Sequence, residues 1–229
     1  MDTIIDGIEV KIHETDPLNP DSDGDEMPDG FELLYDLNPN NPADAKEDLD
    51  MDGMPNIWEF QMRLNPNNSL DASWDSDWDG IPNLWEFQMG LNATFFEDAF
   101  LDADEDGMPN YWEYEMGLNA TNANDAQLDL DEDGLPSIWE YTMGLDALNS
   151  SDSSLDPDHD NLTHLEEYLA GTNPFNRDSD YDGFLDGNDS NPLSFMQPTG
   201  FILLGSVFTP IVIFVIFKNL KLKKSEETI

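Results

Sequence analysis

Carboxylates recur along this chain at a spacing that suits a divalent cation. The motif Asp-x-Asp-x-Asp begins seven times, at an even spacing for the first six starts and after a shorter step for the last. An acidic residue stands eleven positions after every start, and Gly or Asn occupies the sixth position of six of the seven loops. Calcium takes about six to eight oxygen ligands from a flexible loop of about twelve residues with a sharp turn at its sixth position. The sequence therefore predicts seven calcium loops.

The side-chain ligands are expected at the first, third, fifth, ninth and twelfth positions of each loop. The residues at these positions are Asp21, Asp23, Asp25, Asp29 and Glu32; Asp48, Asp50, Asp52, Asn56 and Glu59; Asp75, Asp77, Asp79, Asn83 and Glu86; Asp102, Asp104, Asp106, Asn110 and Glu113; Asp129, Asp131, Asp133, Ser137 and Glu140; Asp156, Asp158, Asp160 and Glu167; and Asp178, Asp180, Asp182, Asp186 and Asp189. His164 stands at the ninth position of the sixth loop and offers no oxygen. Glu26 replaces Gly at the sixth position of the first loop. This questions the geometry of that site, because the turn needs a positive φ.

Other interpretations of the acidic motifs are weaker. A merely solvated acidic surface would need neither the Gly nor a fixed acid at the twelfth position. Magnesium requires a stricter octahedron and retains its waters, which makes it the second choice of cation. His159 and His164 offer a zinc alternative, but both lie within one calcium-type loop. The sequence contains no arrangement of nucleophile and base, so we expect no enzymatic activity.

A further aspartate precedes five of the loops by four positions. These residues are Asp44, Asp71, Asp98, Asp125 and Asp152. One interpretation is a turn or cap residue, since Asp favours both. The other is an extra ligand that links adjacent sites. The sequence leaves both open.

A short helix is expected after each loop. Pro at the eighth position suits a helix start, because its missing N–H is not needed there. Gly90, Gly117, Gly144 and Gly171 suit a helix end about two turns later. Two turns are too short to be stable alone, so their apolar side chains must pack on neighbouring units. The predicted fold is an elongated tandem array of calcium loop and short-helix repeats, rich in α-helix with little or no sheet.

A row of tryptophans follows the same repeat. Its members are Trp58, Trp85, Trp112 and Trp139. We expect them to pack between units, because helices this short offer no other core. An exposed ligand-binding stripe is the alternative.

The chain resembles the thrombospondin type 3-like calcium repeats of microbial surfaces. The segments 15–25 (Thr-Asp-Pro-Leu-Asn-Pro-Asp-Ser-Asp-Gly-Asp) and 162–180 carry this resemblance most clearly, and it extends over about residues 1–192. The order of loop and helix is also that of dockerin modules, the second half of an EF-hand. The chain departs from the animal family by having no Cys, and its middle units are longer. The resemblance implies calcium and an elongated extracellular region.

The C-terminal end predicts a membrane anchor. Residues 199–217 form an uncharged run, close to the length of about 20 residues that spans a bilayer as a helix. Residues 218–229 hold four of the eight basic residues. The positive-inside rule places this tail in the cytoplasm and the repeats outside. A cleaved sorting signal is the alternative.

The remaining segments complete the predicted organisation. Residues 21–192 form the seven repeats, and residues 193–198 form a linker. Residues 1–20 match a truncated repeat and a linker, which indicates a fragment or a misassigned start.

Charge and composition restrict the classes of function that are open to this chain. The formal net charge of -43 excludes nucleic acid as a partner, because phosphate binding needs basic side chains. Acceptor sequences for N-glycosylation begin at Asn67, Asn92, Asn119, Asn149, Asn161 and Asn188, which suits a glycoprotein outside the cell. We expect a single-pass plasma-membrane protein whose calcium-rigidified repeats form a stalk, a surface-layer component or an adhesion component with a protein partner at the surface. The alternative is a dockerin-like module for calcium-dependent assembly, which needs its tenth- and eleventh-position side chains, such as Ile57 and Trp58, to be free.

Overall fold

The computed structural model describes residues 14–16 and 18–195. Within these residues, the regular elements are short helices, and the described part contains no strand. The α-helices are α2 (Asp29–Leu34), α3 (Asn56–Met62), α4 (Asn83–Met89), α5 (Asn110–Met116), α6 (Ser137–Met143) and α7 (His164–Ala170). The 3-10 helices are η2 (Asp44–Lys46), η3 (Asp71–Ser73), η4 (Phe96–Phe100), η5 (Asp125–Gln127), η6 (Asp152–Ser154) and η7 (Asp186–Asn188). The prediction of repeated short-helix units without a sheet is confirmed for this part of the chain.

The helices begin and end where the sequence predicted. Pro55 and its counterparts are the extended residues directly before α2 to α6, and Thr163 starts α7 with a capping box to Glu166. Gly90 and the equivalent Gly after α5, α6 and α7 end their helices in the left-handed region, with φ of 72° to 79°. Arg63 takes the same conformation after α3, with φ 63°. Each of these helices therefore stops after about two turns.

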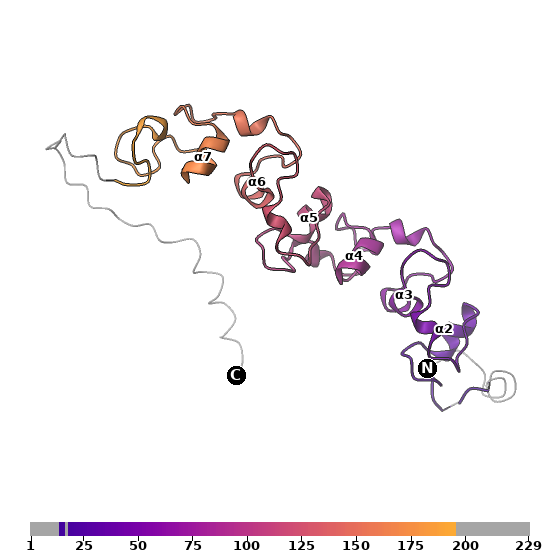
Figure 1. The fold of residues 1–229 in the computed structure, drawn as a ribbon. Helices are drawn as coiled ribbons and strands as arrows, with labels where there is room; N and C mark the ends of the chain where they lie inside the picture. Colours follow the sequence, from indigo (N-terminus) through magenta and orange to yellow (C-terminus); the bar gives the residue numbers. More distant parts are fainter. Residues whose placement is uncertain (1–13, 17, 196–229) are drawn as a thin grey trace, which may run out of the picture.

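The units follow one another as an elongated, curved row, from α2 at the indigo end to α7 at the orange end (Figure 1). Each α-helix from α3 to α7 packs against the 3-10 helix that precedes its own loop. The apolar core is correspondingly small and repeated. It contains small residues such as Ala72 and Ala99 on the 3-10 helices, and the fully buried seventh-position side chains Met27, Met54, Ile81, Met108 and Leu135.

Successive helices are also joined by aromatic side chains. The ring centroids of Trp58 and Phe87 lie 5.3 Å apart, and those of Trp85 and Tyr114 lie 5.4 Å apart. Trp112 and Trp139 contact the equivalent rings of the next helices, at 5.2 and 5.6 Å. The Trp row thus packs against the next unit, as expected, and does not form a separate exposed stripe.

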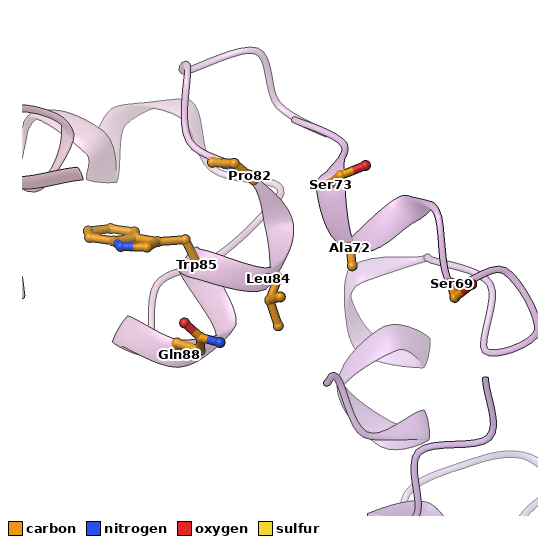
Figure 2. A pocket seen from close by; sticks show the side chains of 7 residues that line it. All are labelled: Ser69, Ala72, Ser73, Pro82, Leu84, Trp85 and Gln88. Carbon is orange, nitrogen blue, oxygen red and sulfur yellow. The ribbon is translucent and has the colours of Figure 1, made fainter. Parts of the chain in front are cut away.

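The tenth-position side chains face the opposite neighbour. An added Cβ on Gly53 would lie 3.0 Å from Leu84 Cδ1, and one on Gly80 would lie 2.7 Å from Tyr111 Cε2. Leu84 and Trp85 accordingly leave α4 in different directions (Figure 2).

A shallow apolar depression lies beside these side chains, where α4 meets η3 (Figure 2). It is lined by Ser69, Ala72, Ser73, Pro82, Leu84, Trp85 and Gln88. None of these lining residues is charged. The depression is an apolar hollow between α4 and the 3-10 helix that precedes its loop.

Three predicted segments lie wholly or mostly outside the described residues. The expected membrane helix at 199–217 and the basic tail at 218–229 are both beyond them, as is most of the truncated repeat at 1–20. Among the residues that the structure does describe, none of the helices has the length and apolar character needed to cross a membrane.

Candidate metal centres

The first aspartate of each loop folds the backbone into a tight curl. In the third loop, Asp75 Oδ1 accepts hydrogen bonds from the N–H groups of Trp78 (2.7 Å) and Asp79 (3.1 Å), and its Oδ2 accepts from Gly80 N–H (3.0 Å). Positive φ is found at the fourth and sixth positions of this curl, where Trp78 and Gly80 have 70° and 99°. The first loop follows the same path although Glu26 replaces Gly, because Glu26 adopts φ 81°.

The curl gathers the acidic side chains of each loop. In the third unit, one oxygen each from Asp77, Asp79, Glu86 and Asp98 lie within 4.8 Å of one another. The fourth unit repeats this group, and smaller groups occur in the first two units. Their members are Asp104, Asp106, Glu113 and Asp125; Asp21, Asp23 and Asp25; Asp25, Glu32 and Asp44; and Asp48, Asp50 and Asp52. Glu86 and Asp98, twelve positions apart in the sequence, are thus brought into one group.

The twelfth-position glutamates are fully buried members of these groups. Neither carboxylate oxygen of any of them has a hydrogen-bond partner among the described residues. Unpaired buried carboxylates are strongly unfavourable, and buried polar groups in proteins are nearly always satisfied. With their neighbouring aspartates, these glutamates form groups that could hold a metal ion. The six residues, all 0% exposed, are Glu32, Glu59, Glu86, Glu113, Glu140 and Glu167.

The electrostatics of the metal-free sites agree with this. Burial, together with the carboxylates of Asp77, Asp79 and Asp98, raises the pKa of Glu86 to about 9. Burial and the neighbouring aspartates likewise raise the pKa of Glu59 to about 9. Without a cation, these glutamates favour their protonated form, whereas a divalent ion would favour the carboxylate.

The aspartates that precede the loops contribute both to a turn and to the acidic groups, as Asp98 shows. Asp98 is 7% exposed; its Oδ2 accepts a hydrogen bond from Asn92 N–H at 2.9 Å, and its Oδ1 has no partner among the described residues. These residues therefore stabilise a turn and also point an oxygen toward the site. Their constant spacing from the loops was the signal in the sequence. The same pattern of one held and one unpaired oxygen recurs at Asp44, Asp71, Asp125 and Asp152.

The ninth-position asparagines make hydrogen bonds within the chain. Asn110 Oδ1 accepts from Ala103 N–H at 3.1 Å, while Asn110 Nδ2 donates to the Asp98 carbonyl at 2.8 Å. Asn56 and Asn83 do the same in their units. These side chains therefore link the turn before a loop to the loop itself, and their role as ligands remains a prediction.

Three other ninth-position side chains also bind within the protein. Ser137 Oγ donates to the Leu128 carbonyl at 2.9 Å. Asp29 accepts hydrogen bonds from the backbone N–H and the hydroxyl of Ser22, both at 2.7 Å. Asp186 accepts from the backbone N–H of Ser179 at 2.9 Å and from its hydroxyl at 2.6 Å. All three side chains are thus hydrogen-bonded to nearby residues of the chain.

The seventh loop is less enclosed than the others. Asp178 Oδ1 and Oδ2 accept the N–H groups of Asp182 and Gly183, at 3.1 and 3.0 Å, so the curl is kept. Asp189 at its twelfth position is only half-buried, and its Oδ1 accepts Asn191 N–H at 2.9 Å. The η7 turn replaces the α-helix that follows the other loops. We expect this site to be the weakest.

Comparison with protein-family models, with curated proteins and with solved structures finds no match to this chain. The chemistry of the sites is therefore the basis for a functional assignment.

Proposed function

We propose that the chain is a calcium-binding repeat protein of the thrombospondin type 3-like kind, in which calcium rigidifies an extracellular spacer. The observation that supports this most is the row of buried, unpaired twelfth-position glutamates. An apolar side chain would serve a purely structural core better, because a buried carboxylate without a partner opposes folding.

The donor set favours calcium over other metals. Each of the third and fourth units offers four carboxylates, such as Asp77, Asp79, Glu86 and Asp98, and the chain has no Cys. Hard oxygen donors on a flexible loop suit calcium, whose larger coordination shell tolerates irregular geometry better than that of magnesium. Calcium, when bound, would supply the positive charge that these carboxylates lack.

The packing of the helices supports a continuous array rather than a dockerin-like binding module. A free module would present its tenth- and eleventh-position side chains to a partner. Here Leu84 lies against Gly53 of the preceding unit, and Trp85 lies against Tyr114 of the following unit. Both faces of the helix are occupied by the chain itself, as a spacer of stacked repeats requires.

A location at the cell surface, with the repeats outside and residues 199–217 as the anchor, is part of this proposal. Free calcium outside cells is high enough to fill weak extracellular-type sites. The glycosylation acceptors Asn67, Asn92, Asn119 and Asn149 are all exposed in the described part of the chain. Such a spacer would hold a binding or adhesive partner away from the membrane.

Counting the bound ions tests the proposal. Native mass spectrometry of the full chain in detergent, after dialysis against calcium, should show near seven ions, with the seventh lost first. The Glu86→Gln variant should bind one ion fewer, because it keeps the shape of the side chain and removes its charge. Two or fewer ions on the parent chain would contradict the proposal.

A further inference from the structure

Five of the sites extend beyond their own loops to the turn that begins the next unit. We call Asp44, Asp71, Asp98, Asp125 and Asp152 the junction aspartates. Asp98 is only 7% exposed, and it belongs to the group formed with Asp77, Asp79 and Glu86. Its Oδ1 is unpaired among the described residues, whereas its Oδ2 is fixed by Asn92 N–H at 2.9 Å. The turn thus orients one carboxylate oxygen toward the position of a cation.

The backbone of the same residue holds the following unit. The Asp98 carbonyl accepts a hydrogen bond of 2.8 Å from Asn110 Nδ2, at the start of α5. Asn110 is 0% exposed, and its Oδ1 accepts Ala103 N–H at 3.1 Å, which fixes the beginning of the next loop.

Other junctions repeat this link. The Asp44 carbonyl accepts from Asn56 Nδ2 and the Asp71 carbonyl from Asn83 Nδ2, both at 2.8 Å. In the sixth unit, His164 Nδ1 lies 2.9 Å from the Asp152 carbonyl. The link therefore does not depend on an amide side chain at the ninth position.

We propose that the junction aspartates are additional metal ligands, and that through them the ion of each unit orders the unit that follows it toward the C-terminus. This inference rests on the proposed calcium binding. The side chain of a junction aspartate reaches back to the preceding site. The carbonyls of Asp44, Asp71, Asp98 and Asp152 reach forward to the next loop, whereas at the Asp125 junction Ser137 bonds the Leu128 carbonyl instead. One residue therefore joins two successive units.

Between the sixth and seventh units, Ser179 accepts the turn hydrogen bond that a junction aspartate accepts elsewhere. Ser179 Oγ accepts the N–H of Asn173 at 3.0 Å, the bond that a junction aspartate accepts in the earlier units. Asp186 of the seventh unit is 3% exposed and is held by Ser179. A Cβ on the adjacent Gly187 would lie 2.7 Å from the Asp160 carbonyl, so the seventh unit lies directly against the sixth loop.

This arrangement places the Asp186 carboxylate beside the sixth site. Asp186 contributes to raising the pKa of Glu167 and that of Asp158, as Asp98 does for Glu86. Asp186 thus lies near the sixth site, while Ser179 holds both of its carboxylate oxygens.

The coupling has a direction. Apolar contacts, such as Leu84 against Gly53 and Trp85 against Tyr114, join a unit to both of its neighbours. The junction aspartate is different, because its carboxylate belongs to the preceding site and its carbonyl holds the following helix, as at Asp98. Loss of the carboxylate at one site should therefore loosen the following helix more than the preceding one.

The test compares Asp98→Asn with Glu97→Gln in the full chain. Both variants remove one negative charge from η4, but Glu97 is exposed and lies outside the cluster. Calcium titration followed by native mass spectrometry should show that Asp98→Asn weakens one site at least about tenfold, because ligand charge sets affinity in such loops. Hydrogen exchange at saturating calcium should be faster in α5 and unchanged in α3, whereas Glu97→Gln should behave as the parent chain.

A second variant separates ligation from coupling. Asn110→Ala removes the hydrogen bond to the Asp98 carbonyl and no carboxylate. It should leave the affinity of the third site within about threefold of the parent and should raise exchange in α5. Equal behaviour of Asp98→Asn and Glu97→Gln would overturn the inference while leaving calcium binding intact, as would equal loosening of α3 and α5. Absence of calcium from the parent chain would overturn both this inference and the proposed function.

Discussion

The twelfth-position glutamates are buried carboxylates for which the described residues provide no hydrogen-bond donor. Glu86 lies fully buried among Asp77, Asp79 and Asp98, and the described residues offer its oxygens no donor. Protonation can relieve this locally, since the pKa of Glu86 is raised to about 9. A divalent cation relieves it for the whole group, because it attracts every carboxylate at once.

Calcium binding should therefore release protons near neutral pH. The pKa of Glu59 and that of Glu86 rise from 4.5 to about 9. Below pH 4.5 both glutamates are protonated in the folded and the unfolded metal-free chain, so the folded state has its full stability there. This stability is lost as the pH rises from 4.5 through about 9, because the unfolded chain releases these protons more readily than the folded one. The metal-free chain should accordingly lose helical circular dichroism as the pH is raised across this window, whereas calcium should abolish the pH dependence. Proton release can be measured by titration of a weakly buffered neutral sample, and binding without proton release would contradict these pKa shifts.

The residues differ in how far their roles could be predicted. The loop aspartates and Gly80 were identified from sequence, because the ligand order and the positive φ follow from local chain geometry. The role of Asp98 was left open, because its approach to Glu86 depends on how the chain folds back between α4 and η4. Asn110 was predicted as a ligand since its amide oxygen suits calcium. Only the structure shows that this oxygen and the amide nitrogen are both engaged by the backbone.

The helices show why the units depend on one another. An isolated helix of two turns is unstable in water. Helix α4 is stabilised on one side by Leu84 against the second unit and on the other by Trp85 against Tyr114. These contacts were expected in kind from the short helical pattern. Which neighbour receives each side chain was not, since that choice depends on the rotation between successive units.

Two tryptophans of the third unit provide a matched test of this packing. Trp85→Ala removes the ring contact with Tyr114. It should destabilise the junction of the third and fourth units by about 2 kcal/mol, less than the roughly 3–5 kcal/mol typical of a buried Trp, because Trp85 is only partly buried. Trp78, by contrast, is 83% exposed. Trp78→Ala should therefore change local stability by less than about 0.5 kcal/mol, as is usual for surface substitutions.

Hydrogen exchange of α4 and α5 in the presence of calcium measures both effects. Faster exchange in Trp85→Ala alone is the expected result. Equal effects of the two substitutions would show that the aromatic contacts do not hold the units together.

The whole molecule combines a small core with a very large negative charge. Its net charge is -43, and the fully buried apolar side chains of the units are few and separate. Self-repulsion of this size favours expansion of the chain. In the described part of the chain, the helices that pack together belong to neighbouring segments of the array in Figure 1, and the core is divided among the units. Binding of a cation to each loop would then supply much of the folding free energy.

Removal of calcium tests most directly whether the metal holds the repeats together. Small-angle X-ray scattering and Trp fluorescence should be recorded on the same sample with calcium, after chelation, and after calcium is restored. We expect a thin, extended particle with calcium, a wider and more flexible one with more exposed Trp after chelation, and full recovery when calcium returns. Unchanged scattering and fluorescence after complete removal of the metal would show that the repeats fold without it, and would contradict the central claim.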